Sequence, residues 1–310
     1  WLTNLESPIT GVSPLYGQVG NQQSLRSRMA HVLLADERGA DDRFSAAEVE
    51  LALIGNRNFL GEAVLDELIT LCEQRGSTPV SVDGQDVDLT AGCAALSVWD
   101  GTMNLMSAGA PLFREFAFQF RTAPQWDVPF NPESPVTTPS GLADTETTYQ
   151  HLARAMLNMQ AAGIAMDATL GEVQFVERST VAGLPSGVKL PWGGAHNVEG
   201  GFNVFDTQIN DPTLLPRHSY PSLNSSTRLS ADAGGYHINY VSSWMIVMNF
   251  TDTGPDGRGI FTYSQSSNRT SEHFLDQTQL YSSQPQLRPM LFTNEDIEAN
   301  KIMELNLSSQ

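Results

Sequence analysis

The spacing of the apolar residues changes along this chain from a helical period to a strand period, and this change constrains the fold most. The first part has apolar residues three and four positions apart, which is typical of amphipathic helices. The second part has short apolar runs between Gly-, Pro- and Asp-rich turns, which is typical of strands. A Pro-rich stretch, Trp126–Gly141, lies at the change. We therefore predict an α+β fold, with an irregular strap and a mainly helical region over residues 1–125 and a β-rich region over residues 126–310.

Individual elements follow from local signals. Ser45 and Glu48 have the spacing of a capping box at the start of one helix. The run Asp252–Gly257 predicts a hairpin turn, because Asp and Gly tolerate the positive φ angles that such turns need. Helices are predicted over Leu25–Leu34, from Ser45, and over Gly61–Cys72, Thr90–Trp99, Ala108–Phe120 and Thr145–Ala162. Strands are predicted over Val173–Val176, Phe202–Val204, His237–Phe250 and Gly259–Ser264, and the tail Asn294–Leu307 is expected to form a short capped helix and a last strand, MELNL.

The charge of the chain excludes two classes of partner. The formal net charge is −18, and the acidic residues are spread along all 310 positions. A polyanion of this kind repels nucleic acid and anionic membrane surfaces, so we assign neither as a partner. No apolar run approaches the roughly 20 residues that a membrane-spanning helix needs. The charge is explained by solubility alone.

The two cysteines are close enough in sequence to pair. Cys72 ends one amphipathic stretch and Cys93 lies in the next, with a polar, turn-rich loop between them. An even count at this spacing predicts one disulfide in an oxidising compartment. The alternative is two buried free thiols. No Cys or His spacing suggests a zinc site.

The segment Gly259–Tyr281, GIFTYSQSSNRTSEHFLDQTQLY, carries the clearest functional signal. It resembles the C-terminal signature of the penicillin acylase family, in which a Gln-Ser loop precedes a Ser-x-His-aromatic-x-Asp-Gln run. Six more segments resemble the acyl-homoserine-lactone acylase branch in the same order: WLTNLESPITGVSPLYG, QSLRSRMAHVLL, LIGNRNFLGEAVLDELITLC, CAALSVWDG, GAPLFREF and KLPWGGAHNVEGG. The resemblance covers about Trp1 to Tyr281.

The resemblance implies an N-terminal-nucleophile hydrolase with a four-layer αββα sandwich and an added helical region. In this family, autoproteolysis exposes a Ser whose free α-amino group acts as the base for its own hydroxyl. An α-amine has a pKa of about 8, which suits this role near neutral pH. A backbone N–H and an Asn amide hold the oxyanion. Because residue 1 is Trp and the family's Asn precedes the matching Trp-Leu, the nucleophile and this Asn are expected on other segments of the same precursor.

By the family pattern, Arg26 lies behind the oxyanion Asn and orients both that Asn and the amide substrate. A guanidinium with its fixed fork of donors suits this role better than Lys. Arg28 points to a different helical face, and the remaining alternative is that both arginines are solvated surface residues. Asn58 is a weaker candidate for substrate binding. The resemblance leaves room for a structural calcium ion whose ligands lie mostly outside this chain, and no other cofactor is expected.

Two histidines match family motifs, and we expect structural roles for both. His273 could form a triad with Asp276 and Ser264, Ser266 or Ser267, but triads are usually assembled from distant segments. We expect His273 and Asp276 to satisfy buried polar groups around the Gln265 loop instead. His196 is expected to be structural as well.

The sequence therefore predicts the C-terminal part of the large (β) subunit of a bacterial, periplasmic or secreted amidohydrolase. Its partners would be the α subunit and the N-terminal part of the β subunit. The substrate would be an N-acylated small amine, first an N-acyl-homoserine lactone, with penicillins and acylated peptides as further candidates. The alternative is a non-catalytic secreted binding or assembly module, which would need no nucleophile.

Overall fold

The computed structural model describes residues 11, 13, 15, 20–36, 41–206, 218–283 and 286–307. The strap predicted for residues 1–18 lies outside these residues except at three positions. Among the described residues, no helix combines the length and the apolar character needed to cross a bilayer.

The chain forms two compact units, and each contains two segments of sequence. Unit 1 comprises Trp1–Glu37 and Ala52–Ser242, and unit 2 comprises Arg38–Leu51 and Ser243–Gln310. These units do not follow the change of pattern near residue 126, because helices α5 and α6 on its two sides pack against each other within unit 1. The regions 1–125 and 126–310 remain a prediction about subunit organisation.

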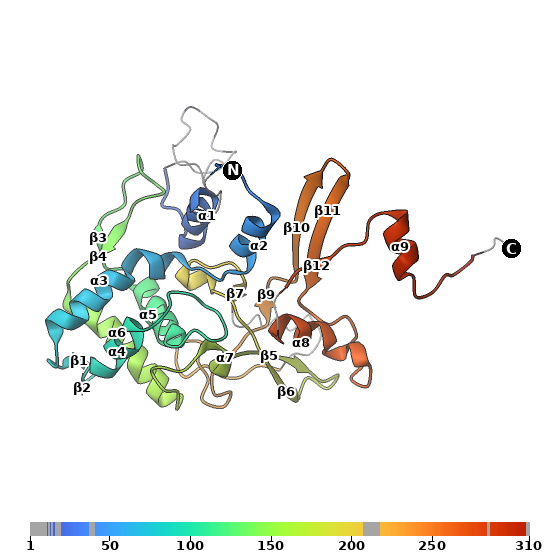
Figure 1. The fold of residues 1–310 in the computed structure, drawn as a ribbon. Helices are drawn as coiled ribbons and strands as arrows, with labels where there is room; N and C mark the ends of the chain where they lie inside the picture. Colours follow the sequence, from blue (N-terminus) through green and yellow to red (C-terminus); the bar gives the residue numbers. More distant parts are fainter. Residues whose placement is uncertain are drawn as a thin grey trace. The chain divides into compact units, whose positions relative to one another are not determined.

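Both helices and strands are present in the described residues, which confirms the α+β class (Figure 1). The helices are α1 (Leu25–Asp36), α2 (Ala46–Ile54), α3 (Phe59–Arg75), α4 (Thr90–Ser97), α5 (Ala110–Thr122), α6 (Glu146–Ala161), α7 (Leu170–Val173), α8 (Asp276–Ser283) and α9 (Asn294–Asn300), with 3₁₀ turns η3 (Asn197–Glu199) and η4 (Glu272–Phe274). The strands are β1 (Val80–Val82), β2 (Gln85–Val87), β3 (Trp126–Val128), β4 (Ser140–Leu142), β5 (Gln174–Ser179), β6 (Pro185–Pro191), β7 (Val204–Asp206), β8 (Tyr236–His237), β9 (Tyr240–Val241), β10 (Trp244–Thr251), β11 (Gly254–Phe261) and β12 (Arg288–Pro289).

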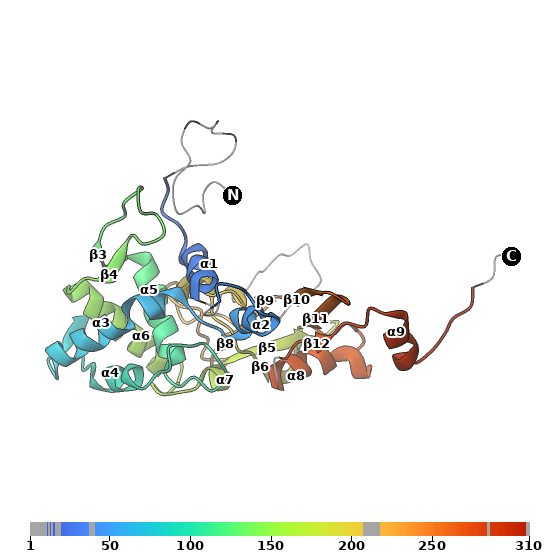
Figure 2. The ribbon, with the colours of Figure 1, turned by 45° about the horizontal axis from the view of Figure 1, so that its top comes forward.

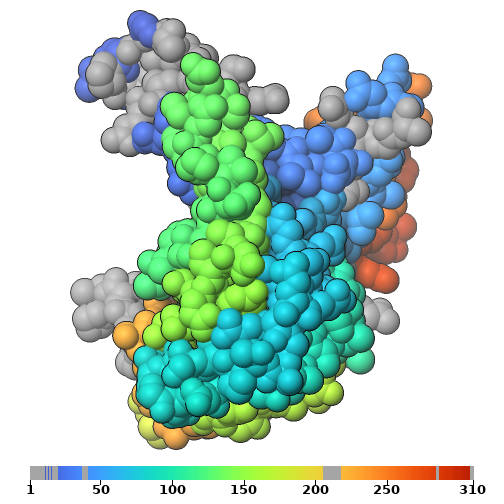
Figure 3. Space-filling view, turned by 90° about the vertical axis from the view of Figure 1, so that its left-hand side faces the viewer, coloured from blue at the N-terminus to red at the C-terminus, as the bar shows by residue number. Residues whose placement is uncertain are grey.

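Unit 1 is built around α5, which lies among α3, α4 and α6 in two views (Figures 1 and 2). Every residue of α5 from Ala110 to Phe120 is buried, so this helix forms the centre of the core. The rings of Trp99 and Phe113 stack at 4.5 Å between centroids, which joins the end of α4 to α5. Figure 3 shows the side of unit 1 where α3, α6 and the β1–β2 hairpin come to the surface. The aromatic side chains of α5, at Phe113, Phe116, Phe118 and Phe120, therefore belong to the core of unit 1.

The small sheets of unit 1 carry the loop that matters for the site. β5 pairs antiparallel with β6 and parallel with β8, and β7 pairs antiparallel with β9. The loop between β6 and β7, Trp192–Asn203, contains η3 and is mostly buried. Unit 1 therefore holds this loop between α1, α3 and α5.

Unit 2 contains a hairpin, β10 with β11, to which β12 adds a third strand. Thr251 pairs with Gly254, so the turn predicted from Asp252–Gly257 is confirmed and is tight. The capping box of α2 is also confirmed, because the backbone N–H of Ser45 donates to Glu48 at 2.7 Å and the N–H of Glu48 donates to Ser45 Oγ at 3.3 Å.

Two predictions about strands are wrong in detail, and two strands form in the Pro-rich stretch, where none was predicted. The long strand over His237–Phe250 is divided into β8, β9 and β10, because the chain leaves one small sheet and enters another. The predicted last strand over residues 303–307 has no regular structure, although the preceding capped helix is confirmed as α9. The Pro-rich stretch after Trp126 contains the paired strands β3 and β4, and β4 packs on α3.

Candidate functional site

Arg26, on the first turn of α1, is held by the loop before β7. Its Nη1 donates to the carbonyl oxygens of Gly201 at 2.9 Å and Phe202 at 3.1 Å. Its guanidinium carbon lies 4.5 Å from the centroid of the Phe202 ring. No Asp or Glu in the described part of the chain pairs with Arg26. This half-buried cation is therefore oriented by backbone carbonyls and an aromatic face.

A hollow of about 330 Å³ lies beside this guanidinium. Its wall is one face of α1 together with the Phe202 ring, and combines a charged end at Arg26 with apolar side chains further along the helix. Burial lowers the pKa of Arg26, but a guanidinium remains charged near neutral pH. The lining residues are Arg26, Ser27, Ala30, His31, Leu34 and Phe202.

Arg28 has a structural position in the core of unit 1. Its Nε donates to the Val136 carbonyl at 2.6 Å and its Nη1 to the Pro139 carbonyl at 2.7 Å. Its guanidinium lies 4.2 Å from the Phe59 ring centroid, and burial lowers its pKa to about 10. The alternative that both arginines are solvated is therefore wrong, because Arg28 is 2% exposed. Arg28 ties the β3–β4 segment to α1, and Arg26 is left as the arginine at the hollow.

Asn58 is the N-cap of α3. Its Oδ1 accepts from the N–H of Gly61 at 2.7 Å, and its Nδ2 donates to the carbonyl of Gly101 at 2.9 Å. The side chain is fully buried. These contacts give Asn58 a clear role in holding the start of α3, and its suggested part in substrate binding remains a prediction.

His273 and Asp276 form a surface pair in unit 2. His273 Nδ1 and Asp276 Oδ2 are 2.8 Å apart, and the histidine side chain is 64% exposed. The hydrogen bond to Asp276 raises the pKa of His273. The expectation that the pair satisfies buried polar groups is confirmed only for Asp276, which hydrogen-bonds to the buried hydroxyl of Ser264, beside Gln265. Ser264 is buried and accepts from the N–H of Thr278 at 3.2 Å, so its hydroxyl serves the packing of α8.

His196 is structural, as expected. It is 2% exposed, and its Nδ1 accepts from the N–H of Val198 at 2.8 Å, which caps η3. Burial lowers the pKa of His196 well below its usual value. The neutral ring packs against Phe118 with 5.4 Å between centroids.

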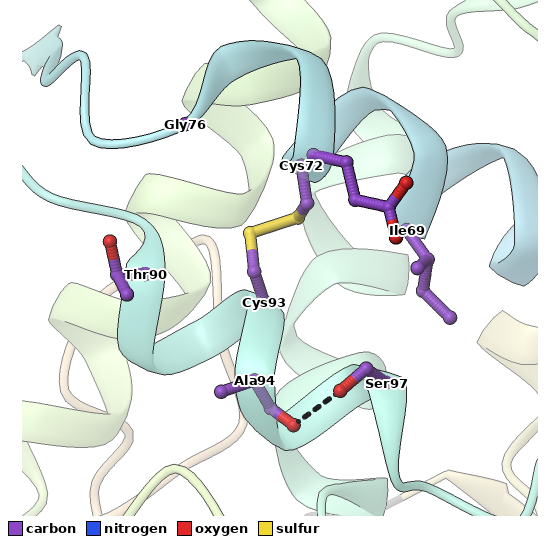
Figure 4. A pocket seen from close by; sticks show the side chains of 8 residues that line it. Ile69, Cys72, Gly76, Thr90, Cys93, Ala94 and Ser97 are labelled. Atoms are coloured by element: carbon purple, nitrogen blue, oxygen red, sulfur yellow. Dashed lines mark hydrogen bonds between the residues drawn. A yellow bond between two sulfur atoms is a disulfide. The ribbon is translucent and has the colours of Figure 1, made fainter.

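The predicted disulfide joins Cys72 at the end of α3 to Cys93 in α4, with a Cα–Cα distance of 5.8 Å. Figure 4 shows the bond at the side of a shallow hollow between the two helices, with Thr90 and Ser97 nearby. The hollow has a volume of about 270 Å³. The free-thiol alternative is therefore wrong, and the disulfide closes the loop that contains β1 and β2.

A buried ion pair beneath the loop before β7 was not expected from the sequence. Arg114 of α5 donates from Nη2 to Glu199 Oε1 at 2.7 Å and from Nε to Oε2 at 3.1 Å, and both side chains are 0% exposed. Arg114 also donates to Gln174 Oε1 and to the Gly194 carbonyl. The available signal was an Arg-Glu dipeptide inside an otherwise apolar helix, LFREFAFQF.

Glu115, the second charged residue of that dipeptide, has its own group of donors. It accepts from Tyr236 Oη at 2.6 Å, from Thr227 Oγ1 at 2.8 Å and from Asn158 Nδ2 at 2.9 Å. Burial raises the pKa of this carboxyl to about 7, although the three donors and Arg114 oppose the rise. Glu115 and its three donors lie inside the core, so we expect the protonation of this carboxyl to affect the free energy of unfolding.

Comparison with known proteins defines the family. Residues 4–299 match the family model described as penicillin amidase. The chain belongs to the penicillin amidase family. It is 29% identical over 319 residues to the acyl-homoserine lactone acylase PvdQ of Pseudomonas syringae pv. syringae, covering 100% of this chain and 36% of that protein. It is 31% identical over 288 residues to the aculeacin-A acylase of Actinoplanes utahensis, covering 91% of this chain and 33% of that protein.

The chain thus spans about a third of the length of the penicillin amidase relatives that it matches. Within this third, the structure brings together Arg26 and the Trp192–Asn203 loop, which the sequence had treated as separate motifs. Among the described residues, no three or more His, Cys, Asp and Glu side chains are arranged to hold a metal ion.

Proposed function

We propose that this chain is the C-terminal part of the large subunit of an amidohydrolase that releases an acyl chain from a small amine. The match to the penicillin amidase family over residues 4–299 carries this proposal. Two relatives whose matches cover 100% and 91% of this chain are named as acylases, one for acyl-homoserine lactones and one for aculeacin A. We take an N-acyl-homoserine lactone as the first substrate to test, with penicillins and acylated peptides next.

The chemistry proposed for the complete enzyme uses an N-terminal Ser on another segment. Its α-amine would take the hydroxyl proton as the oxygen attacks the amide carbonyl, and the tetrahedral oxyanion would be held by hydrogen-bond donors. Arg26 would act on this step through an Asn that holds the oxyanion. Its guanidinium suits this role because it has no carboxylate partner in the described residues and borders a hollow of about 330 Å³. A preoriented cation contributes without rearranging during the reaction.

The need for a partner segment is supported by β10 in unit 2. This strand is apolar on both faces: Met245 and Val247 are buried, while Trp244, Ile246 and Phe250 are 39%, 42% and 82% exposed. A strand of this kind is typical of a sheet that is covered on both sides. We propose that another part of the same precursor covers the exposed face and completes a four-layer αββα sandwich.

The disulfide supports a periplasmic or secreted location. Structural disulfides persist in oxidising compartments and are rare in the reducing cytosol. Cys72 and Cys93 form such a bond between two helices of unit 1.

The proposal is tested on the full-length precursor. After expression into the periplasm, mass spectrometry and N-terminal sequencing should find two chains, the larger beginning with Ser. The purified protein should release free amine from N-acyl-homoserine lactones of graded chain length. Arg26→Lys should lower kcat by tenfold or more, by analogy with the loss of an oxyanion-site donor, which costs about 10² in rate.

Arg154→Lys is the matched control, because Arg154 forms an exposed ion pair with Asp83 and lies far along the chain on α6. It should leave kcat unchanged. A single unprocessed polypeptide that releases no amine from acyl lactones, penicillins or acyl peptides would exclude the proposed activity and favour a binding module.

A further inference from the structure

The Trp192–Asn203 loop matches a family motif, yet the proposed chemistry gives it no task. It is packed too closely to be an ordinary surface connection. A Cβ on Gly201 would lie 2.0 Å from Ala195 Cβ, and a Cβ on Gly200 would lie 2.8 Å from the Cβ atoms of Leu25 and Phe59. Gly200 has φ +84°, so a side chain there is excluded by backbone conformation as well. Gly200 brings the loop backbone directly against the starts of α1 and α3, and Gly201 brings it against Ala195 of the same loop.

The buried ion pair of Arg114 and Glu199 fixes the loop to helix α5 in the core. Glu199 accepts two donors of Arg114 and also the backbone N–H of His196 at 2.7 Å. Arg114 in turn donates to the Gly194 carbonyl at 3.0 Å. One buried guanidinium therefore holds both the carboxylate and the backbone of this loop, and breaking such a pair leaves an uncompensated charge in the core.

The far end of the loop is fixed separately. Asn203 is 2% exposed and donates from Nδ2 to Asn56 Oδ1 at 2.7 Å and to the Leu53 carbonyl at 3.2 Å. Asn56 continues the network by donating to Asn104 Oδ1 at 2.9 Å. With Glu199 held at one end and Asn203 at the other, Gly201 and Phe202 between them have little freedom to move.

The groups presented by this fixed segment are those that contact Arg26. The carbonyls of Gly201 and Phe202 both accept from Nη1, and the Phe202 ring lies under the guanidinium at 4.5 Å. The carbonyls fix the position of one nitrogen, and the ring supports the rest of the group from one side. Both Arg26 and Phe202 border the hollow beside α1.

We propose that Phe202 is a positioning residue for the proposed amide hydrolysis, acting through Arg26. The loop anchored by Arg114 and Glu199 is the rigid support, and the Phe202 ring sets the direction of the Arg26 donors. The inference rests on the proposed function for its kinetic consequences, while its geometric content stands independently.

The test is a double-mutant cycle in the full-length, processed enzyme. Phe202→Leu keeps apolar volume but removes the aromatic face, and should lower kcat about fivefold, the size typical of an exposed cation–π contact, with little change in KM. Phe202→Tyr should retain the wild-type rate. In an Arg26→Lys background, Phe202→Leu should change kcat much less, because the planar group that it orients is gone.

Phe175→Leu is the matched control for stability. Phe175 is a buried aromatic residue of unit 1. Like Phe202 it lies beside a cation, because Lys189 Nζ is 4.5 Å from the centroid of its ring. It should lower the melting temperature without changing kcat. If Phe202→Leu lowers kcat equally in both backgrounds, or if Phe202→Tyr fails to retain the rate, Phe202 acts only through the packing of the loop and the proposal is overturned.

A crystal structure of the Phe202→Leu variant separates this inference from the proposed function. If Arg26 leaves the Gly201 carbonyl or its guanidinium plane turns, the positioning role is supported even when no amide substrate is found. If the Arg26 side chain is unchanged in that variant, the positioning role is refuted, whatever the enzyme hydrolyses.

Discussion

Glu115 should make the stability of this protein depend on pH in a direction opposite to that of most carboxylates. The side chain is fully buried in α5 and accepts hydrogen bonds from Tyr236, Thr227 and Asn158. Glu115→Gln keeps the shape of the group and removes its titration. When wild-type Glu115 takes a proton, the hydroxyl of Tyr236 or Thr227 can turn and accept instead of donating, so the network survives protonation.

The size of the effect follows from the pKa. Burial raises the folded pKa to about 7 from an ordinary value of 4.5. At 1.36 kcal/mol per unit, the carboxylate form costs about 3 kcal/mol of folding free energy. Because the folded pKa is raised, the stabilising effect of the bound proton is complete below pH 4.5 and is lost as the pH rises through about 7. Between pH 5 and pH 8, wild type should lose about 2.5 kcal/mol more than the variant.

Thermal unfolding of wild type and Glu115→Gln in parallel, in half-unit steps from pH 5 to pH 8, measures this difference. At about 2 °C per kcal/mol for a unit of this size, the two curves should diverge by roughly 5 °C across the range. Glu73→Gln, at an exposed position of α3, is the control and should run parallel to wild type. Curves for Glu115→Gln that stay parallel to wild type would refute the reasoning, since the buried carboxyl would then titrate as it does in the unfolded chain.

Three further predictions concern the anchors of unit 1. Replacing Cys72 and Cys93 together by Ser opens a loop with a sequence separation of 21 and should cost about 3 kcal/mol in the chain-entropy model. Calorimetry of the oxidised wild type and the double variant measures this loss, and a double variant as stable as the oxidised wild type would contradict it. Glu199→Gln leaves the Arg114 charge buried without its partner and should lower the free energy of unfolding by about 3–5 kcal/mol. Denaturant unfolding measures this change, and a loss below 1 kcal/mol would mean that the pair is not buried in solution. Asn58→Ala removes the N-cap of α3 and should cost about 1–2 kcal/mol, whereas Asn58→Asp should retain most of the cap. If both variants lose the same hydrogen-exchange protection in α3, loss of the cap is not the cause.

The elements that could be predicted from the sequence are those that local chemistry determines. The capping box of Ser45 and Glu48 and the tight turn after Thr251 depend on residues within a few positions of each other, and both are present. The run His237–Phe250 shows the limit of such reasoning. Its apolar residues were assigned to one strand, but the choice of partner strands is non-local, and three separate strands in three sheets result.

The same limit explains the site. Sequence spacing separated Arg26 from Arg28 by helical face, and the structure places only Arg26 at the hollow. Its contact with Phe202, 176 positions away, could not be read from either motif alone. Arg114 and Glu115 were hidden for another reason: they lie among the aromatic residues of one helix, and their partners Glu199 and Tyr236 lie on distant segments.

The interleaving of the two units has a consequence for genetic dissection. Arg38–Leu51 belongs to the unit that is otherwise formed by Ser243–Gln310, and Glu50 contributes to it by accepting from the N–H of Leu287 at 3.3 Å and lying 3.8 Å from Arg258. A truncation before Ser243 would therefore remove the packing partners of Arg38–Leu51. A C-terminal fragment that begins at Ser243 would in turn lack Arg38–Leu51, which belongs to the same unit. Neither unit can be transplanted, swapped or deleted by a single cut in the gene. Recombination between relatives should be tolerated only where both segments are exchanged together.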